Sequence, residues 1–311
     1  MSTEKRNENF MLKQSRYSKG KKNVKQYSKN NASKKSGSGK NSYNAYYKKN
    51  DDGFQPKSNG KSNYGKKKYT SKSKGYPKKN AQKPSIKIAF LGGLNEIGKN
   101  ITLVECENDI IIIDCGMAFP DGDMLGVDLV IPDFTYIEQN ADRVKGIILT
   151  HGHEDHIGGL PFLLSKVNVP IYGTPLTLGL VGNKLKEHSL YNQSQLNVIN
   201  AGQSIKLGCM KIDFIHVNHS IPDAVAFAIH TPGGTIVHTG DFKIDCTPIT
   251  GDMIDLSSFA RVGDEGVLAL LSESTNAERP GYTPTERTVS DSLDNLFKSA
   301  ENYRIIIATF A

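Results

Sequence analysis

The hydrophobic and polar positions divide the chain into two unlike parts. From residue 85 onward, short apolar runs alternate with polar turns, whereas residues 1–84 contain almost no aliphatic side chains. The runs predict strands at 85–91, 100–105, 110–114, 146–150, 170–173, 205–207, 211–217, 224–230, 235–238 and 304–311, and helices at 160–165, 175–187 and 286–303. Strands with helices between them favour an α/β fold in which two sheets face each other and helices lie outside.

The charges are divided in the same way. Residues 1–84 hold 24 Lys and Arg against 4 Asp and Glu, whereas 85–311 hold 15 against 28. This tail of Lys, Asn, Ser, Gly and Tyr cannot bury enough apolar surface to offset its chain entropy, so we predict that it is disordered. Eight of the 13 tyrosines lie in it. Lysines among tyrosines suit nonspecific binding of RNA, because ammonium groups neutralise phosphates and rings stack on bases. A solvated linker, an anionic membrane surface or a protein partner are the alternatives.

Two further features bear on the compartment. No run approaches the ~20 apolar residues of a membrane span, and the basic tail lacks the apolar segment of a secretory signal. The four cysteines show no paired spacing. We therefore expect a cytoplasmic protein with reduced thiols and no membrane span.

The strongest chemical signal is the segment 150–159, which reads Thr-His-Gly-His-Glu-Asp-His-Ile-Gly-Gly. It places His151, His153, Asp155 and His156 within six positions, although the whole chain has only 8 histidines. Imidazoles and a carboxylate so close together suit divalent cations, above all Zn²⁺. The segment follows a predicted strand, and sites of layered α/β folds lie at strand ends. This concentration argues against a polar loop with scattered histidines.

Other candidate ligands also follow predicted strands. His219 and Asp241 each come shortly after an apolar run, and Asp114 ends another. His216 lies within a predicted strand, so we interpret it as structural. His238 precedes Asp241, and its position fits equally well a buried residue or one that supports a ligand.

The order of these residues resembles the metallo-β-lactamase superfamily, whose signature is His-x-His-x-Asp-His. Four narrower segments resemble the ribonuclease J family, the bacterial members of the β-CASP nucleases: 91–100, 219–223, 240–243 and 272–282. The resemblance covers 85–311. It implies a metallo-β-lactamase αββα sandwich at 85–281, preceded by the tail at 1–84 and followed by the beginning of a β-CASP domain at 282–311.

The resemblance also implies a site and an activity. It assigns His151, His153 and His219 to one metal ion, Asp155 and His156 to a second, Asp241 to both, and supporting roles to Asp114 and Glu273. Asp155 would also orient the attacking water. The implied cofactors are two divalent ions, with Zn²⁺ first and Mn²⁺ or Mg²⁺ as alternatives. The implied activity is RNA phosphodiester hydrolysis with 5′-phosphate products, by internal or 5′-to-3′ cleavage, in rRNA processing and mRNA decay. The full-length form is expected to be a homo-oligomer.

One departure from the family affects this interpretation. Family members continue for a few hundred residues beyond the position of Ala311, with a later histidine at the second metal and a pocket for the RNA 5′ end. We therefore expect a C-terminally truncated member that ends in a buried strand at 304–311. Two alternatives remain: a thioester hydrolase of the same superfamily, which the basic tail and Glu273 disfavour, and an inactive RNA-binding fragment with an incomplete metal site.

Overall fold

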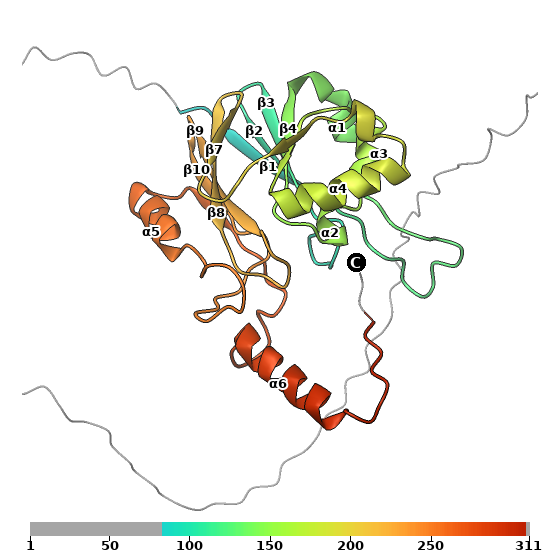
Figure 1. Ribbon diagram of the computed structural model, residues 1–311. Helices are drawn as coiled ribbons and strands as arrows, with labels where there is room; N and C mark the ends of the chain where they lie inside the picture. The colour runs from blue at the N-terminus through green and yellow to red at the C-terminus, as the bar shows by residue number, and fades with distance from the viewer. Residues whose placement is uncertain (1–82, 309–311) are drawn as a thin grey trace, which may run out of the picture. The chain divides into compact units, whose positions relative to one another are not determined.

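The computed structural model describes residues 83–308, which form two β-sheets with helices on their outer faces (Figure 1). The first sheet has the order β1 (Ile86–Gly92), β2 (Ile101–Cys106), β3 (Asp109–Ile113), β4 (Val144–Ile148), β5 (Ile171–Gly173) and β6 (Leu196–Val198). The second has the order β11 (Ala269–Leu271), β10 (Gly234–His238), β9 (Val225–Thr231), β8 (Met210–His216) and β7 (Ser204–Leu207). The predicted disordered tail lies outside the described residues, apart from its last two positions.

The direction of the strands changes within each sheet. In the first, β1, β2 and β3 pair antiparallel, with β2 and β3 forming a hairpin, and β3 to β6 run parallel. In the second, β7 to β10 are antiparallel and β11 pairs parallel to β10. The parallel connections contain helices α1 (Thr135–Gln139), α2 (Glu154–Ile157), α3 (Leu160–Leu164) and α4 (Pro175–Glu187), together with the short 3₁₀ helices η1 (Ala141–Arg143) and η2 (Tyr191–Gln193). Helices α1, α3 and α4 cover one side of the first sheet (Figure 1).

Strand β3 reads as a nearly continuous apolar run, and β2 carries apolar residues on both of its faces, because both faces of each strand are buried. Leu103 and Ile112 pack with the helix layer, whereas their neighbours Val104 and Ile111 pack against the second sheet. Successive side chains of a strand point to opposite faces, so one run supplies two cores. The core between the sheets also contains Phe214 of β8, whose ring meets that of Phe227 edge to face at 5.2 Å.

The second sheet is covered on its outer face by α5 (Leu256–Glu265). Val262 of this helix packs with Ala226 and Ala228 of β9, whose small side chains let the helix approach closely. The molecule thus has four layers in the order helices, sheet, sheet, helix. The predicted α/β class with an αββα sandwich is confirmed.

The C-terminal prediction is wrong within the described residues. Helix α6 (Glu286–Ser299) ends before the predicted position 303, and residues 304–308 form no strand. Ile306 and Ile307 are 84% and 74% exposed rather than buried. An apolar, β-branched run becomes a strand only where a neighbouring strand accepts its hydrogen bonds, and none pairs with 304–308 in the part of the chain that is described. Positions 309–311 lie outside it. No helix among residues 83–308 is long and apolar enough to cross a membrane.

Candidate metal centre

Three imidazoles meet at the ends of β4 and β8. His151 and His153 follow β4, and His219 lies three residues beyond β8. Nε2 of His151 is 3.0 Å from Nδ1 of His153, which in turn is 3.3 Å from Nε2 of His219. The three potential ligand atoms lie within 4.8 Å of one another. The structure thus brings together residues 66 positions apart in the sequence.

A second group contains a carboxylate. Helix α2 begins directly after His153 and turns Asp155 and His156 toward the site. Ligand atoms of His151, His156 and Asp241 lie within 4.8 Å of one another. Oδ2 of Asp241 is 3.6 Å from Nε2 of His156 and 3.7 Å from Nε2 of His219, and Oδ2 of Asp155 is also 3.6 Å from Nε2 of His156. Asp241 therefore lies between the two groups.

Asp114 supports this arrangement through contacts with Thr150 and with Nδ1 of His156, on the side of that ring away from the potential ligand atom. It follows β3 directly and adopts a left-handed backbone conformation, with φ of 60°. Its buried carboxylate accepts hydrogen bonds from Thr150 N and Oγ1, both at 2.8 Å, and lies 2.8 Å from Nδ1 of His156. The last contact places a hydrogen on Nδ1, so Nε2 is the nitrogen that faces Asp155 and Asp241.

The protonation of the site follows from burial and charge. Burial lowers the pKa of His151, His153 and His219, which keeps these imidazoles neutral with a lone pair available. Burial also opposes the charged form of His156, but the charges of Asp114 and Asp241 outweigh it and raise the pKa of His156 to about 10. For Asp241, burial is outweighed by the nearby His156, 3.6 Å away, which holds the pKa of the carboxyl well below its usual range. Neutral imidazoles and ionised carboxylates are the forms that bind divalent cations, so His151, His153, His219 and Asp241 fit such ions as they stand. His156 is protonated in the metal-free protein, and a cation bound at its Nε2 would replace one proton.

Asn100 is a site residue that the sequence analysis missed. Its Nδ2 lies 3.3 Å from Asp155 Oδ2, 3.1 Å from Asp155 O and 3.2 Å from His156 Nε2. Its backbone N–H donates to Asp155 O at 3.0 Å. The asparagine stands at the end of the family-like segment 91–100, and that position was the only available signal. No local pattern shows that it contacts a residue 55 positions later.

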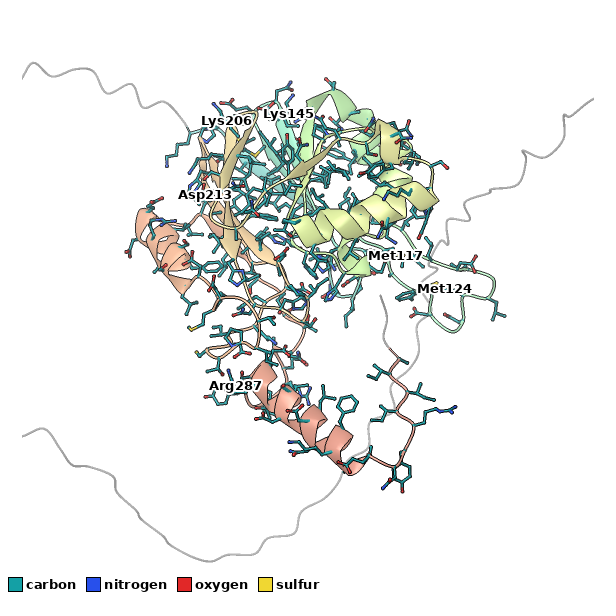
Figure 2. The ribbon with its side chains drawn as sticks, viewed as in Figure 1. Met117, Met124, Lys145, Lys206, Asp213 and Arg287 are labelled. Carbon is teal, nitrogen blue, oxygen red and sulfur yellow. The ribbon has the colours of Figure 1, made fainter. Side chains whose placement is uncertain are left out.

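A close approach between two backbone segments also fixes the position of α2. A Cβ added to Gly116 would lie only 1.5 Å from the carbonyl oxygen of Asp155, so this position requires glycine. The next residue, Met117, donates its N–H to Glu154 O at 3.2 Å. Figure 2 shows Met117 near α2, whereas Met124 lies farther out along the same loop. The chain therefore holds α2 through its backbone as well as through Asn100.

Glu273 does not belong to either ligand group. Its Oε1 accepts the N–H of Phe242 at 3.3 Å and its Oε2 that of Thr275 at 3.1 Å, so it holds the loop next to Asp241. His238 acts on the same loop, because its Nδ1 accepts the N–H of Gly240 at 3.1 Å. His216, in contrast, lies 3.0 Å from the carbonyl oxygen of Asp252.

A cleft of about 760 Å³ opens beside the second group. The turn at 92–98 and the segment 270–275 line it, together with Asp155, His156 and Asp241. Carboxylate oxygens and the imidazoles of His156 and His238 therefore line a space large enough for part of a substrate.

Comparison with known proteins agrees with this geometry. The family model for the metallo-β-lactamase superfamily matches residues 94–282. Ribonuclease J 1 of Streptococcus pyogenes is 49% identical over 226 residues, which cover 73% of this chain and 40% of that protein. Ribonuclease J2 of Bacillus subtilis is 47% identical over 234 residues, covering 75% and 42%. Among solved structures, the chain is similar to a protein of unknown function from Enterococcus faecalis, with a TM-score of 0.53 and 17% sequence identity. The match covers 70% of this chain and 58% of that one, and it shows likeness of fold alone.

The chain spans only part of these relatives, 40% and 42% of the two ribonuclease J proteins. The predicted resemblance to ribonuclease J is confirmed over the region that aligns. With the family match from 94 to 282 and a His/Asp cluster suited to divalent metals at the strand ends, the chain belongs to the metallo-β-lactamase superfamily.

Proposed function

We propose that this chain carries the catalytic metal centre of a ribonuclease. His151, His153 and His219 would hold one cation and Asp155 and His156 a second, with Asp241 bound to both. The observation that carries the proposal is the position of Asp241, whose Oδ2 is 3.6 Å from one group and 3.7 Å from the other. RNA as the substrate is supported by the similarity to two proteins named ribonuclease J and by the lysines and tyrosines of residues 1–84.

The bound cations would supply a water of lowered pKa and would stabilise negative charge on the phosphate. Asn100 keeps the Asp155 carboxylate in place, so its Oδ2 can orient the attacking water and accept its proton. Asp114 keeps His156 in one tautomer and one orientation. Attack by the water opposite the 3′ oxygen would form a new P–O bond and break the bond from phosphorus to the 3′ oxygen, which takes up a proton from solvent to give a 3′-hydroxyl. The phosphate then stays at the 5′ end of the downstream product.

The donor atoms support zinc as the first choice of metal. The group of His151, His153 and His219 offers three nitrogens, which Zn²⁺ prefers. The second group has more oxygen ligands, which Mn²⁺ or Mg²⁺ also accept. Internal cleavage and 5′-to-3′ degradation, in rRNA processing and mRNA decay in the cytoplasm, are both part of the proposal.

We also propose the division of the chain into a tail at 1–84, a metallo-β-lactamase domain at 85–281 and the beginning of a β-CASP domain at 282–311. The end of the family match at 282 and the start of α6 at Glu286 support the second boundary. Association into a homo-oligomer belongs to the proposed full-length form.

The test is hydrolysis of a 5′-monophosphorylated, end-labelled RNA with Zn²⁺ or Mn²⁺. We would compare the chain with its Asp155→Ala variant and with Asp142→Ala, which removes an exposed carboxylate from η1. Metal-dependent cleavage that is lost in the first variant and kept in the second supports the proposal. Cleavage that survives Asp155→Ala would contradict the assigned role. Thioester hydrolysis by a folded chain that leaves RNA intact would favour the small-molecule hydrolase.

A further inference from the structure

The loop after Asp241 connects the metal centre to helix α6. The N–H of Lys243 donates to the carbonyl oxygen of Asn218 at 2.7 Å, and Asn218 directly precedes His219. The Lys243 ammonium group forms an ion pair with Glu286, the first residue of α6. One residue therefore touches both the strand end that carries His219 and the beginning of the helix.

Asp245 makes this connection more rigid. The residue is buried, with only 3% of its surface exposed. Oδ1 accepts the N–H of Thr247 at 2.9 Å, which closes the loop on itself, and Oδ2 accepts the N–H of Glu286 at 2.9 Å. The first N–H groups of a helix have no partner within the helix, so this carboxylate satisfies one of them from outside.

The contacts of α6 with the loop lie at its first turn. Thr285, the N-cap residue, donates its hydroxyl to the carbonyl oxygen of Thr247 at 3.0 Å. Figure 2 shows Arg287 at this same end of the helix. Farther along, Val289, Leu293 and Leu296 are 52%, 47% and 63% exposed. A force on the helix would therefore reach the loop through the contacts of its first turn.

We propose that Asp245 is a positioning residue that couples the metal centre to α6. It holds the 241–247 loop between the end of β8 and the helix, so a displacement of α6 moves Asp241 relative to the histidines. The proposal rests on the ligand role proposed for Asp241. Because coupling between two sites is reciprocal, metal binding should in turn stabilise the contact between Asp245 and α6.

The first experiment is calorimetric titration of the metal-free full chain with Zn²⁺. Residues that hold a ligand in place typically contribute about 10- to 100-fold to metal affinity, so Asp245→Ala should weaken binding by that order. Asp133→Ala is the control, since it removes an exposed carboxylate that accepts the backbone N–H and the hydroxyl of Thr135 in α1. That variant should bind Zn²⁺ as the parent does.

A second pair of variants keeps the proposal testable if Asp245→Ala does not fold. Glu286→Pro removes the N–H that Asp245 accepts, whereas Glu286→Ala removes only the side chain. Proline is favoured at the first position of a helix, and the preceding Thr285 already has the extended backbone that proline requires (φ −66°, ψ 150°). We expect weaker Zn²⁺ binding for the proline variant than for the alanine variant.

Hydrogen exchange gives the reciprocal readout. Zn²⁺ should slow exchange of the Glu286 amide in the parent chain, and Asp245→Ala should abolish this effect. If the parent binds no pair of ions, the proposed metal centre itself fails. If it binds two ions and both Asp245→Ala and Glu286→Pro match their controls in affinity, the coupling is overturned while the metal centre stands.

Discussion

Replacing Asp114 by asparagine should destabilise the metal-free protein by several kcal/mol in a manner that depends on pH. The substitution keeps the shape of the side chain but removes its charge. In the structure the buried Asp114 carboxylate accepts two hydrogen bonds from Thr150 and lies 2.8 Å from Nδ1 of His156. Asparagine can accept with one oxygen only, so at least one buried partner loses its hydrogen bond.

The magnitude follows from the pKa of His156. Burial disfavours its charged form, yet Asp114 and Asp241 raise the pKa from 6.5 to about 10. A shift of this size corresponds to about 5 kcal/mol at most, and breaking a buried ion pair typically costs about 3–5 kcal/mol. A raised pKa contributes stability that is complete below about 6.5 and is lost as the pH rises through about 10. The difference between parent and Asp114→Asn should therefore be largest near pH 6.5 and should shrink toward pH 10.

The assay is urea unfolding in the presence of a chelator at several pH values between 6.5 and 10, with free energies of unfolding compared at each. The parent should lose stability across this range more steeply than the variant. A difference that is below about 1 kcal/mol at pH 6.5, or that stays constant up to pH 10, would refute the reasoning. Either result would mean that the Asp114–His156 pair is not charged in the folded, metal-free protein.

Three further changes test the packing, the site and the tail. Gly116→Ala should abolish metal binding in a Zn²⁺ titration, because the new Cβ would lie 1.5 Å from the Asp155 carbonyl oxygen. Gly122→Ala is the control and should leave the titration unchanged, because a Cβ at that position meets nothing within 4 Å. Phe214→Ala should lower the free energy of unfolding by about 3–5 kcal/mol, measured by urea titration, because it empties the core between the sheets. Deleting residues 1–84 should weaken single-stranded RNA binding and flatten its dependence on salt, since fewer lysines then release counterions; an unchanged slope in fluorescence anisotropy would contradict this.

Most of the fold could be predicted because the buried strands appear in the sequence as short apolar runs bounded by polar turns. The run at 110–114 was identified within one residue of β3 (Asp109–Ile113), and the predicted helix at 175–187 has the same bounds as α4. Elements without such a pattern were missed. Strand β6 reads Leu-Asn-Val and β11 reads Ala-Leu-Leu, and neither is rich in the β-branched and aromatic residues that favour strands. Helix α5 buries a single residue, Val262. Their positions are decided by neighbouring elements rather than by local sequence.

The candidate ligands could be predicted because they cluster in the sequence or follow apolar runs. The residues that hold them could not, because their partners are distant. Asn100 meets Asp155 across 55 positions, and Asp245 meets the first turn of α6 across 41. Glu273 was expected to support the site, and the structure places its carboxylate on the backbone of Phe242, beside Asp241.

The two candidate ligand groups of the metal centre are not separate from each other. His151 belongs to both groups, and Asp241 lies at similar distances from each. All of the candidate ligands stand on connections beyond strand ends, where backbone geometry is set by side-chain contacts rather than by strand pairing. Different residues hold the connections after β4 and β10: Asp114 holds the segment after β4, Asn100 holds α2, and Glu273 and Asp245 hold the loop after β10. Because Asp241 is the ligand proposed for both ions, loosening the loop after β10 should weaken both cation positions together, whereas loosening α2 should weaken mainly the position held by Asp155 and His156.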